Sequence, residues 1–500
     1  MHKSKRLFTL LGVLAVLCIA TFALTQFEKK QEAIKNSDEI IMTIPSDTVT
    51  SLSWNYVDDD SSLAFHKGEE TWLYDEDEAF PVSEDKVMGI LSHFEEFGVS
   101  FVIENVEDYS QYGLDNPECT IRITAGEESH TIKLGDFSTM DEQRYVDIGD
   151  GNVYLVSNDP INYVYTDLSS MILHDDAPGF ETVNSITFEG AQNYTITYQE
   201  ENTDSYHEED FYFTTRDGEN VPLDTASVRK YLNTVTSLDL LTYATYNATE
   251  EELVTFGMEE PELSVTIDYV ETHEDETETN ETFRFHISRN PEELAAAEDA
   301  EAKGETANAV TLYVRIGDSQ IIYELDSVDY GILSDAAYDD LRHKEVMWAD
   351  FEDVTQVDIT LEGENHTLSS VYDEDEETRL WYYGMVQDET VETMETTTGT
   401  TSETEADEKD EEEDDTLDMT DFQTALEALS ADSFTGEAST GKEEISLTVH
   451  LDNKNFPTVK IQLYRYDGEH CLAVVDGESV SLVSRSSVVD LIEAVNAIVL

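Results

Sequence analysis

Tyr112-Gly113-Leu114-Asp115-Asn116-Pro117 decides how the fold is interpreted, because the pattern returns as Phe256-Gly257-Met258-Glu259-Glu260-Pro261. The two glycines lie 144 residues apart, and a strand-like run follows each proline. Glycine adopts positive φ without steric penalty, and proline favours an edge or the first position of a strand. The sequence therefore predicts a structural motif that turns the chain into a sheet, with one apolar residue of each copy in the core. Its residues are Tyr112, Gly113, Leu114, Pro117, Phe256, Gly257, Met258 and Pro261.

The chain around the first motif alternates strand-like runs with one clear helical pattern. Val87, Ile90, Leu91 and Phe94 follow a helical period, so we expect a helix over 83–97 that stops at Gly98. An Asp-Gly pair at 150–151 is a strong hairpin signal. A second helix is expected over 160–173, and it closes this unit.

A second unit repeats this order. Asp224 is a favourable N-cap for a helix over 225–238, and a hairpin is expected to turn at Gly317-Asp318. A helix over 328–341 closes the unit. Two polar stretches, 271–281 and 291–308, lengthen this unit relative to the first, and we expect them to form surface loops.

The third unit resembles the others less closely, because it lacks the glycine–proline motif. Thr420-Asp421-Phe422-Gln423 fits a capping box that opens a helix to residue 429, and an apolar helix is expected over 488–500. Residues 389–418 contain 14 Asp and Glu and one Lys, so little of this stretch can be buried. We predict that it is a disordered acidic insertion.

These observations predict an α+β fold of tandem repeats, each a mostly antiparallel β-sheet with a packed helix, preceded by one N-terminal transmembrane helix. The predicted divisions are a membrane anchor or signal at 1–27, a stalk at 28–40, repeats at 41–178 and 179–345, and a divergent third repeat at 346–500 with the insertion at 389–418.

The N-terminus indicates location. Three basic residues precede Leu7 to Phe27, a run of 21 residues without a charge. A spanning helix needs about 20 residues, whereas the apolar region of a signal peptide has about 7–15. Cys18 suggests a lipoprotein, but Leu17 stands where a small residue is required. We favour an uncleaved anchor that leaves most of the chain outside the cell membrane, and cleavage stays an open alternative.

The net charge of −85 arises from 112 acidic and 27 basic residues. Such a surface repels phosphate backbones, so a nucleic-acid partner is excluded, and it attracts cations and basic partners. The aromatic content of 10% argues against a wholly disordered chain.

Sequence motifs of catalysis and metal binding are missing. The 12 histidines are scattered, with no HxxxH or HExxH pair, and no GxSxG, GxGxxG or Walker sequence is present. We therefore predict no catalytic, cofactor-binding or metal-ligating residues and no cofactor. Acidic clusters such as 58–60 and 75–78 attract cations only loosely. Cys119 and Cys471 form either one disulfide or two buried thiols.

The chain resembles the bacterial membrane-anchored domain-of-unknown-function family 4340. The residues that support this resemblance are Trp72-Leu73-Tyr74, Pro81, the helical pattern to Phe97, Tyr112-Gly113-Leu114 with Pro117, and Leu134-Gly135-Asp136. The likeness covers roughly residues 40–345. It implies an association with ABC-type transport systems of the gliding-motility auxiliary type, and it supplies no catalytic residues.

Three functional hypotheses follow. The first is a non-enzymatic accessory or scaffold protein that is attached to the cell membrane through residues 7–27 and contacts an ABC-transporter permease or another envelope protein. The alternative is a cell-surface module that binds envelope polymer or cations. The third, ranked below both, is a hydrolase whose site assembles only in the fold.

Overall fold

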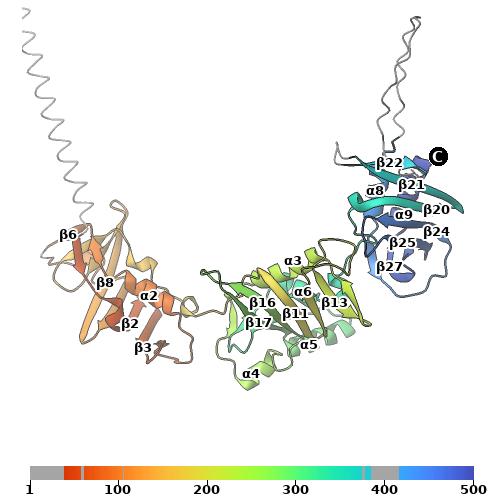
Figure 1. Ribbon diagram of the computed structural model, residues 1–500. Helices are drawn as coiled ribbons and strands as arrows, with labels where there is room; N and C mark the ends of the chain where they lie inside the picture. Colours follow the sequence, from red (N-terminus) through yellow and green to blue (C-terminus); the bar gives the residue numbers. More distant parts are fainter. Residues whose placement is uncertain (1–38, 58–60, 105, 374–377, 385–415, 500) are drawn as a thin grey trace, which may run out of the picture. The chain divides into compact units, whose positions relative to one another are not determined.

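The computed structural model describes residues 39–57, 61–104, 106–373, 378–384 and 416–499 of the chain (Figure 1). The named strands pair in an antiparallel manner and are accompanied by a smaller number of helices, which confirms the predicted α+β class. The chain divides into two compact units. The first runs to Asp176 and includes Leu240–Thr249 and Ser319–Tyr323; the second comprises Ala177–Asp239, Glu250–Asp318 and the chain from Glu324 onward.

The first large sheet has eight strands in the order β4-β3-β2-β7-β8-β9-β10-β6. Leu52 and Trp54 of one central strand lie opposite Ile123 and Ile121 of its neighbour, and all four are buried. Alternating apolar residues thus place one face of the sheet in the core. The strands are β2 (Val49–Tyr56), β3 (Ser61–Lys67), β4 (Trp72–Tyr74), β6 (Phe101–Ile103), β7 (Cys119–Ala125), β8 (Glu128–Ser138), β9 (Gln143–Asp147) and β10 (Val153–Val156).

Helix α2 (Glu84–Ser92) begins at Ser83, whose hydroxyl accepts from the Lys86 backbone N–H at 3.4 Å. The helix is shorter than predicted. Phe97–Val99 forms strand β5, which pairs with β1 (Glu39–Met42), so Gly98 lies in a strand and is not the helix stop. This pairing gives the backbone hydrogen bonds that a longer helix would otherwise provide. The predicted stalk at 28–40 therefore extends too far, because β1 already begins at Glu39.

The predicted helix over 160–173 is wrong. Two short 3₁₀ helices, η3 (Pro160–Asn162) and η4 (Leu168–Met171), occupy this stretch. Asp159 and Asp167 each accept a backbone N–H two residues further on. Such local side-chain bonds stabilise separate turns in place of one continuous helix.

The second large sheet has nine strands in the order β14-β13-β12-β11-β16-β17-β18-β19-β15, and helices α3 and α6 contact each other beside it (Figure 1). Asp224 caps α3 as predicted, accepting from the backbone N–H groups of Ala226 and Ser227. The elements are β11 (Thr182–Gly190), β12 (Tyr194–Tyr198), β13 (Tyr212–Arg216), β14 (Glu219–Pro222), β15 (Tyr243–Thr245), β16 (Leu263–Thr272), β17 (Glu278–Arg289), β18 (Leu312–Ile316), β19 (Ile322–Glu324), α3 (Thr225–Thr236), α4 (Glu250–Thr255), α6 (Ser327–Ser334) and α7 (Tyr338–Leu341).

Both polar stretches of this unit are more regular than predicted. Strands β16 and β17 extend into the first, and their pairing continues to Thr272 opposite Glu278. The second contains helix α5 (Pro291–Ala302), which is capped by Asn290. A capping asparagine, a proline at the first turn and an alanine-rich interior all favour a helix, although none of its residues is buried. The predicted closing helix over 328–341 is divided into α6 and α7 at Asp335.

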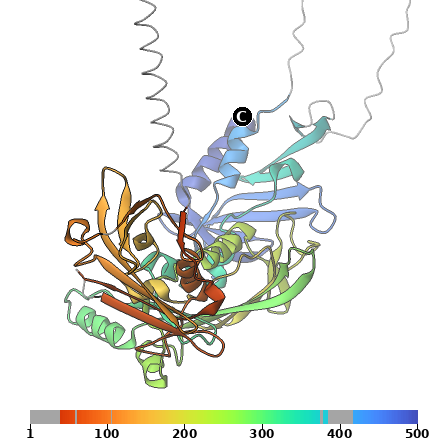
Figure 2. The same cartoon turned by 90° about the vertical axis from the view of Figure 1, so that its left-hand side faces the viewer.

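The third large sheet has eight strands in the order β22-β21-β20-β24-β25-β26-β27-β23. Helices α8 and α9 lie side by side (Figure 2). The elements are β20 (Val354–Leu361), β21 (Glu364–Asp373), β22 (Thr378–Tyr383), β23 (Ala431–Phe434), β24 (Glu443–Leu451), β25 (Thr458–Arg465), β26 (His470–Val475), β27 (Glu478–Ser484), α8 (Thr420–Glu427), α9 (Arg485–Val499) and the 3₁₀ helix η5 (Phe351–Asp353). The 3₁₀ helices η1 (Ser46–Thr48) and η2 (Ser110–Tyr112) belong to the first compact unit.

Two predictions for the divergent third repeat need correction. Helix α8 begins after Met419, which provides no side-chain cap, so the capping box at Thr420 and Gln423 does not form; Asp418 accepts from the Thr420 N–H at 3.0 Å instead. The end of the predicted acidic insertion is ordered, because the Leu417 N–H donates to the Trp381 carbonyl at 2.8 Å. Residues 389–415 of that insertion lie outside the described residues.

The three large sheets share one strand order. In each, the first three strands in the sequence follow one another from the centre of the sheet toward one edge. Four later strands follow one another toward the opposite edge. That opposite edge is occupied by a short strand, which lies between the two groups in the sequence. Strand β14 is an addition at the outer edge of the second sheet. The third sheet thus has the same connectivity although its sequence lacks the motif.

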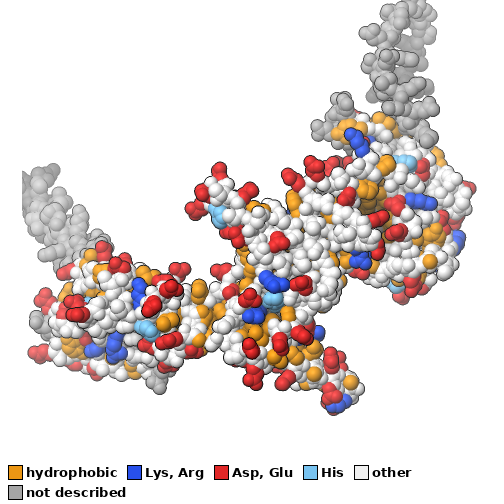
Figure 3. All heavy atoms as spheres, turned by 60° about the horizontal axis from the view of Figure 1, so that its bottom comes forward, with side chains coloured by type: hydrophobic (Ala, Val, Ile, Leu, Met, Phe, Trp, Pro, Cys, Tyr) orange, Lys and Arg blue, Asp and Glu red, His pale blue; other side chains and the backbone are white. Residues whose placement is uncertain are grey.

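The surface and termini add three observations. Asp and Glu side chains cover much of the face in Figure 3, with few Lys and Arg among them. Cys119 and Cys471 are buried free thiols, so the disulfide alternative is wrong. Among the described helices none is long and apolar enough to cross a membrane, and the predicted span at 7–27 lies outside the described residues.

Candidate functional site

The first copy of the sequence motif forms a tight turn that leads into β7. Gly113 has φ of 67°, and the side chain of Leu114 is buried. The Tyr112 ring packs against Tyr145 of β9 with 5.0 Å between centroids. Pro117 lies two residues before the strand begins. The first copy therefore forms a packed turn.

The second copy makes the equivalent contacts. Gly257 has φ of 70°, Met258 is buried, and Pro261 lies two residues before β16. The Phe256 ring packs against Tyr313 of β18 at 4.9 Å. Because β18 occupies the same place in its sheet as β9, the two motifs make the same connection between turn and sheet.

Each motif also carries a glutamate that the sequence analysis missed. Glu118, directly after the first motif, accepts from Arg144 Nη1 at 2.6 Å. Glu262, directly after the second, accepts from Arg289 Nε at 2.9 Å and from the Tyr330 hydroxyl. The recurring Pro-Glu pair was the available signal. The two glutamates meet different partners, since Arg144 lies on β9 and Arg289 ends β17.

A buried carboxylate in the second unit brings together residues that the sequence analysis did not select. Asp210, on the loop between β12 and β13, is 1% exposed. Its oxygens accept from His343 Nε2 at 2.8 Å, from Trp348 Nε1 at 3.1 Å and from the Ser205 hydroxyl at 2.5 Å. Three donors on one carboxylate compensate for its removal from water.

A second imidazole lies beside the same carboxylate. His207 Nδ1 is 3.8 Å from Asp210 Oδ1, and its Nε2 is 3.7 Å from Asp350 Oδ2. The neighbouring Asp210 carboxylate raises the pKa of His207 against the opposing effect of burial. Burial alone would raise the pKa of Asp210, but the nearby His207 imidazole and the hydrogen bonds from His343 and Ser205 together hold that pKa well below its ordinary value.

The loop around Asp210 is attached to the third sheet by an aromatic residue. Tyr206 belongs to the buried cluster that forms the core of the third sheet, and its ring lies 4.7 Å from Trp348 and 6.3 Å from Phe456. Asn453, between β24 and β25, donates to the Tyr206 carbonyl at 3.4 Å. A side chain from a loop of the second sheet therefore completes the third core.

The segment that connects the two sheets is held along its length. Arg342 lies over the rings of Tyr338 and Phe434, at 4.9 and 4.2 Å. Glu345 forms an isolated β-bridge with Ser430, and His343 stacks on Trp348 at 4.5 Å. We call residues 202–210 and 342–350 together the joint. Because side chains from both sheets meet there, it fixes one local arrangement of loop and segment.

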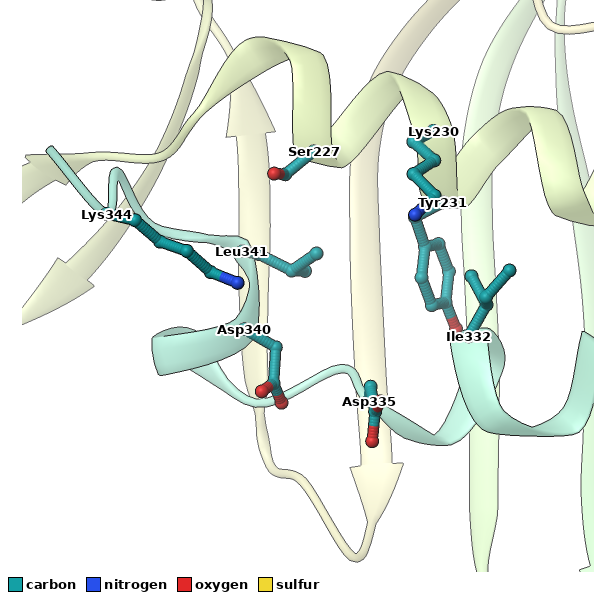
Figure 4. Close-up of a pocket in the computed structure, with 8 residues that line it drawn as sticks. All are labelled: Ser227, Lys230, Tyr231, Ile332, Asp335, Asp340, Leu341 and Lys344. Carbon is teal, nitrogen blue, oxygen red and sulfur yellow. The ribbon is translucent and has the colours of Figure 1, made fainter. Parts of the chain in front are cut away.

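A shallow pocket of about 220 Å³ lies beside the joint (Figure 4). Helix α3 contributes Ser227, Lys230 and Tyr231, and the chain from α6 to the joint contributes Ile332, Asp335, Asp340, Leu341 and Lys344. The charged side chains are exposed, and Asp340 already accepts from the Ala337 N–H. Opposite charges at a solvent-exposed rim give this pocket no preference for one ligand.

Within the described ranges, no group of three or more His, Cys, Asp and Glu side chains is arranged to hold a metal ion. At the joint, Ser205 donates to the carboxylate and not to an imidazole, so it lacks the base that activates a serine nucleophile. The arrangement can hold a charge and respond to protons. These are the properties of a structural and titratable cluster.

The fold and its sites define an α+β protein whose three large sheets share one connectivity. Residues 72–209 match the family model named Domain of unknown function (DUF4340), which confirms the resemblance over these residues. The match begins at β4 and ends in the loop beside Asp210, without reaching the second motif. Searches of curated proteins and of solved structures found no match to the chain.

Tyr206→Phe is expected to leave the stability of the third sheet unchanged or to raise it by about 1 kcal/mol. The Tyr206 hydroxyl is buried and has no hydrogen-bond partner among the described residues, so removing it removes an uncompensated polar group. Urea unfolding monitored through Trp348 fluorescence measures the change. A loss above about 1 kcal/mol would mean that the hydroxyl has a partner in solution.

Proposed function

We propose that this protein is a non-enzymatic accessory subunit that is anchored to the cell membrane and scaffolds an ABC-type transport complex on the outer side. In this proposal the chain consists of three copies of one α+β module. The single observation that supports it most is the strand order common to the three large sheets. Chains of like modules present extended surfaces on which partners assemble.

Charge and sequence add independent support. A net charge of −85 keeps a large extracytoplasmic region soluble and favours partners with basic surfaces. The uncharged run from Leu7 to Phe27 has the length of a membrane span. The family resemblance implies proximity to transport systems of the gliding-motility auxiliary type.

Site-specific photo-crosslinking in intact cells tests this proposal. Met140, at the β8–β9 turn, is 88% exposed, and Tyr466, after β25, is 45% exposed, so both can carry a photoreactive amino acid without disturbing a core. After irradiation and purification of the full chain in mild detergent, we expect a crosslinked permease or another transport subunit from at least one position.

Two controls make the result decisive. Cells that are not irradiated report non-covalent carry-over, and a photoreactive residue at buried Val146 reports crosslinks made only after unfolding. Recovery of the protein alone from both exposed positions would contradict the scaffold function.

The alternative function is a surface module that binds envelope polymer or cations. Tyr372 and Tyr383, on neighbouring strands of the third sheet, are more than half exposed and could stack on sugar rings. Retention on purified cell wall that is lost on adding salt or a chelator would favour this function. A hydrolase ranks third, and it requires a pocket in which a nucleophile and a base converge.

A further inference from the structure

We propose that the joint is a pH-sensitive latch, in which the protonated imidazole of His207 helps to hold the 202–210 loop against the 342–350 segment and its deprotonation loosens it. The geometry that supports this is the placement of Asp210 on the loop and of His343 on the segment, with 2.8 Å between Oδ1 and Nε2. His207 lies on the same loop and reaches Asp350 of the segment at 3.7 Å. Both imidazoles therefore connect the two parts of the joint.

Carboxylates lie close to both imidazoles, whose ring centroids are 6.4 Å apart. His343 Nδ1 is 3.9 Å from Glu345 Oε2. The carboxylates that act on His207 are Asp210 and Glu209 of the loop and Asp350 of the segment. A positive charge on His207 is consequently stabilised by these neighbours, whereas a neutral His207 leaves these carboxylates to repel one another.

The sign of the pH dependence follows from the pKa directions. The pKa of His207 is raised in the folded joint, so its stabilising contribution is complete below the unfolded value and is lost as pH rises through the folded value. The pKa of Asp210 is lowered, so its contribution is present above its unfolded value and is lost only in strong acid. The latch is therefore tightest between about pH 4 and pH 6.5 and loosens above that range.

Loosening above this range is partial, and its site is defined. His343, Trp348 and Ser205 continue to donate to Asp210. The ionic part of the contact is lost, and with it the part of the attachment that depends on proton concentration. We expect the loop to open more often at high pH while both sheets stay folded.

Trp348 provides a reporter inside the latch. Its Nε1 donates to Asp210 at 3.1 Å, the carboxylate that His207 also faces, so a change in the charge of His207 acts on the environment of the indole. Titration of the full chain from about pH 5 to pH 9 should change tryptophan fluorescence in one step that spans the His range. Trp348→Phe should remove this step, because the other three tryptophans lie outside the joint.

Hydrogen exchange of the full chain measures the opening itself. After correction for intrinsic exchange rates, protection of amides 202–210 and 342–350 should be lower at about pH 8.5 than at about pH 5.5. The expected fall is about tenfold for each pKa unit by which pairing raises the imidazole pKa. Amides of β16 and β17, in the centre of the second sheet, should show no such fall. His207→Gln, which keeps a donor without a titrating charge, should flatten the profile.

His450→Gln is the matched control. His450 Nε2 lies 2.8 Å from Asp358 Oδ2, the same contact as at the latch, but both residues stand on the third sheet. This variant should leave the joint profile unchanged. A pH-independent joint in the unmodified chain, or an unchanged profile in His207→Gln, would overturn the proposal.

Discussion

Arg144→Met is expected to destabilise the first unit by about 3–5 kcal/mol, because it leaves a buried carboxylate without its counter-charge. Arg144 Nε contacts both oxygens of Asp159, at 2.8 and 2.7 Å, and the side chains of both residues are more than nine-tenths buried. Its Nη1 also donates to Glu118 and to the Gly135 carbonyl. Methionine fills a similar volume but satisfies none of these acceptors.

The measurement needs a probe of the first unit alone, because unfolding of a chain with several modules is not two-state. Cys119 supplies it: the thiol is buried in this unit, and burial raises its pKa to about 12, so it is labelled only when the unit opens. Pulse labelling of Cys119 across a urea series, read by mass spectrometry, gives the stability of the unit.

Arg284→Met is the matched control for this prediction. Arg284 pairs with Glu189 at 3.0 Å, but about half of each side chain is exposed, and exposed pairs contribute about 0–1 kcal/mol. Labelling of Cys471, in the third sheet, should be unaffected by either variant. If Arg144→Met shifts Cys119 labelling no more than Arg284→Met does, then the Asp159 carboxylate is hydrated in solution.

Local signals predicted the elements that local chemistry determines. Gly113 and Gly257 require positive φ, Asp224 caps a helix with its own side chain, and the Asp-Gly pair at 150–151 closes a hairpin. These interactions join residues a few positions apart, so they can be found in a single sequence. The predicted α+β class rests on them.

The features that the sequence did not reveal depend on distant partners. Phe97–Val99 becomes a strand only because β1 lies beside it, and Asp210 and His343 are 133 residues apart. Histidines scattered along a sequence carry no indication of which carboxylate they will meet. The predicted site residues formed a packing motif, and the titratable cluster had to be found in the folded chain.

Gly135→Ala is expected to destabilise the first unit by about 2–3 kcal/mol through overpacking. A β-carbon at Gly135 would lie 2.2 Å from the Tyr112 carbonyl oxygen and 2.9 Å from the Leu114 side chain. The turn and β8 are also close at a second point, since a β-carbon at Gly113 would lie 2.9 Å from the Asp136 backbone nitrogen. Two of the segments that carry the family resemblance are therefore in direct contact.

Gly89→Ala separates this steric effect from the general effect of replacing glycine. Gly89 lies within α2 with nothing near its missing β-carbon, so alanine there should stabilise the unit by about 0.5–1 kcal/mol. Opposite signs for the two variants, measured by Cys119 labelling, are the expected result. Equal signs would mean that the turn and β8 are farther apart than the structure places them.

The two large effects should also depend on each other. The Gly135 carbonyl accepts from Arg144 Nη1 at 2.5 Å, and the register of β8 against β9 shifts between Leu134 and Phe137. A β-carbon that moves Gly135 away from Tyr112 also moves this carbonyl, so Gly135→Ala weakens part of what Arg144→Met removes. The double variant should lose about 0.5–3 kcal/mol less than the sum of the single losses, whereas strict additivity would show that motif and ion cluster act independently.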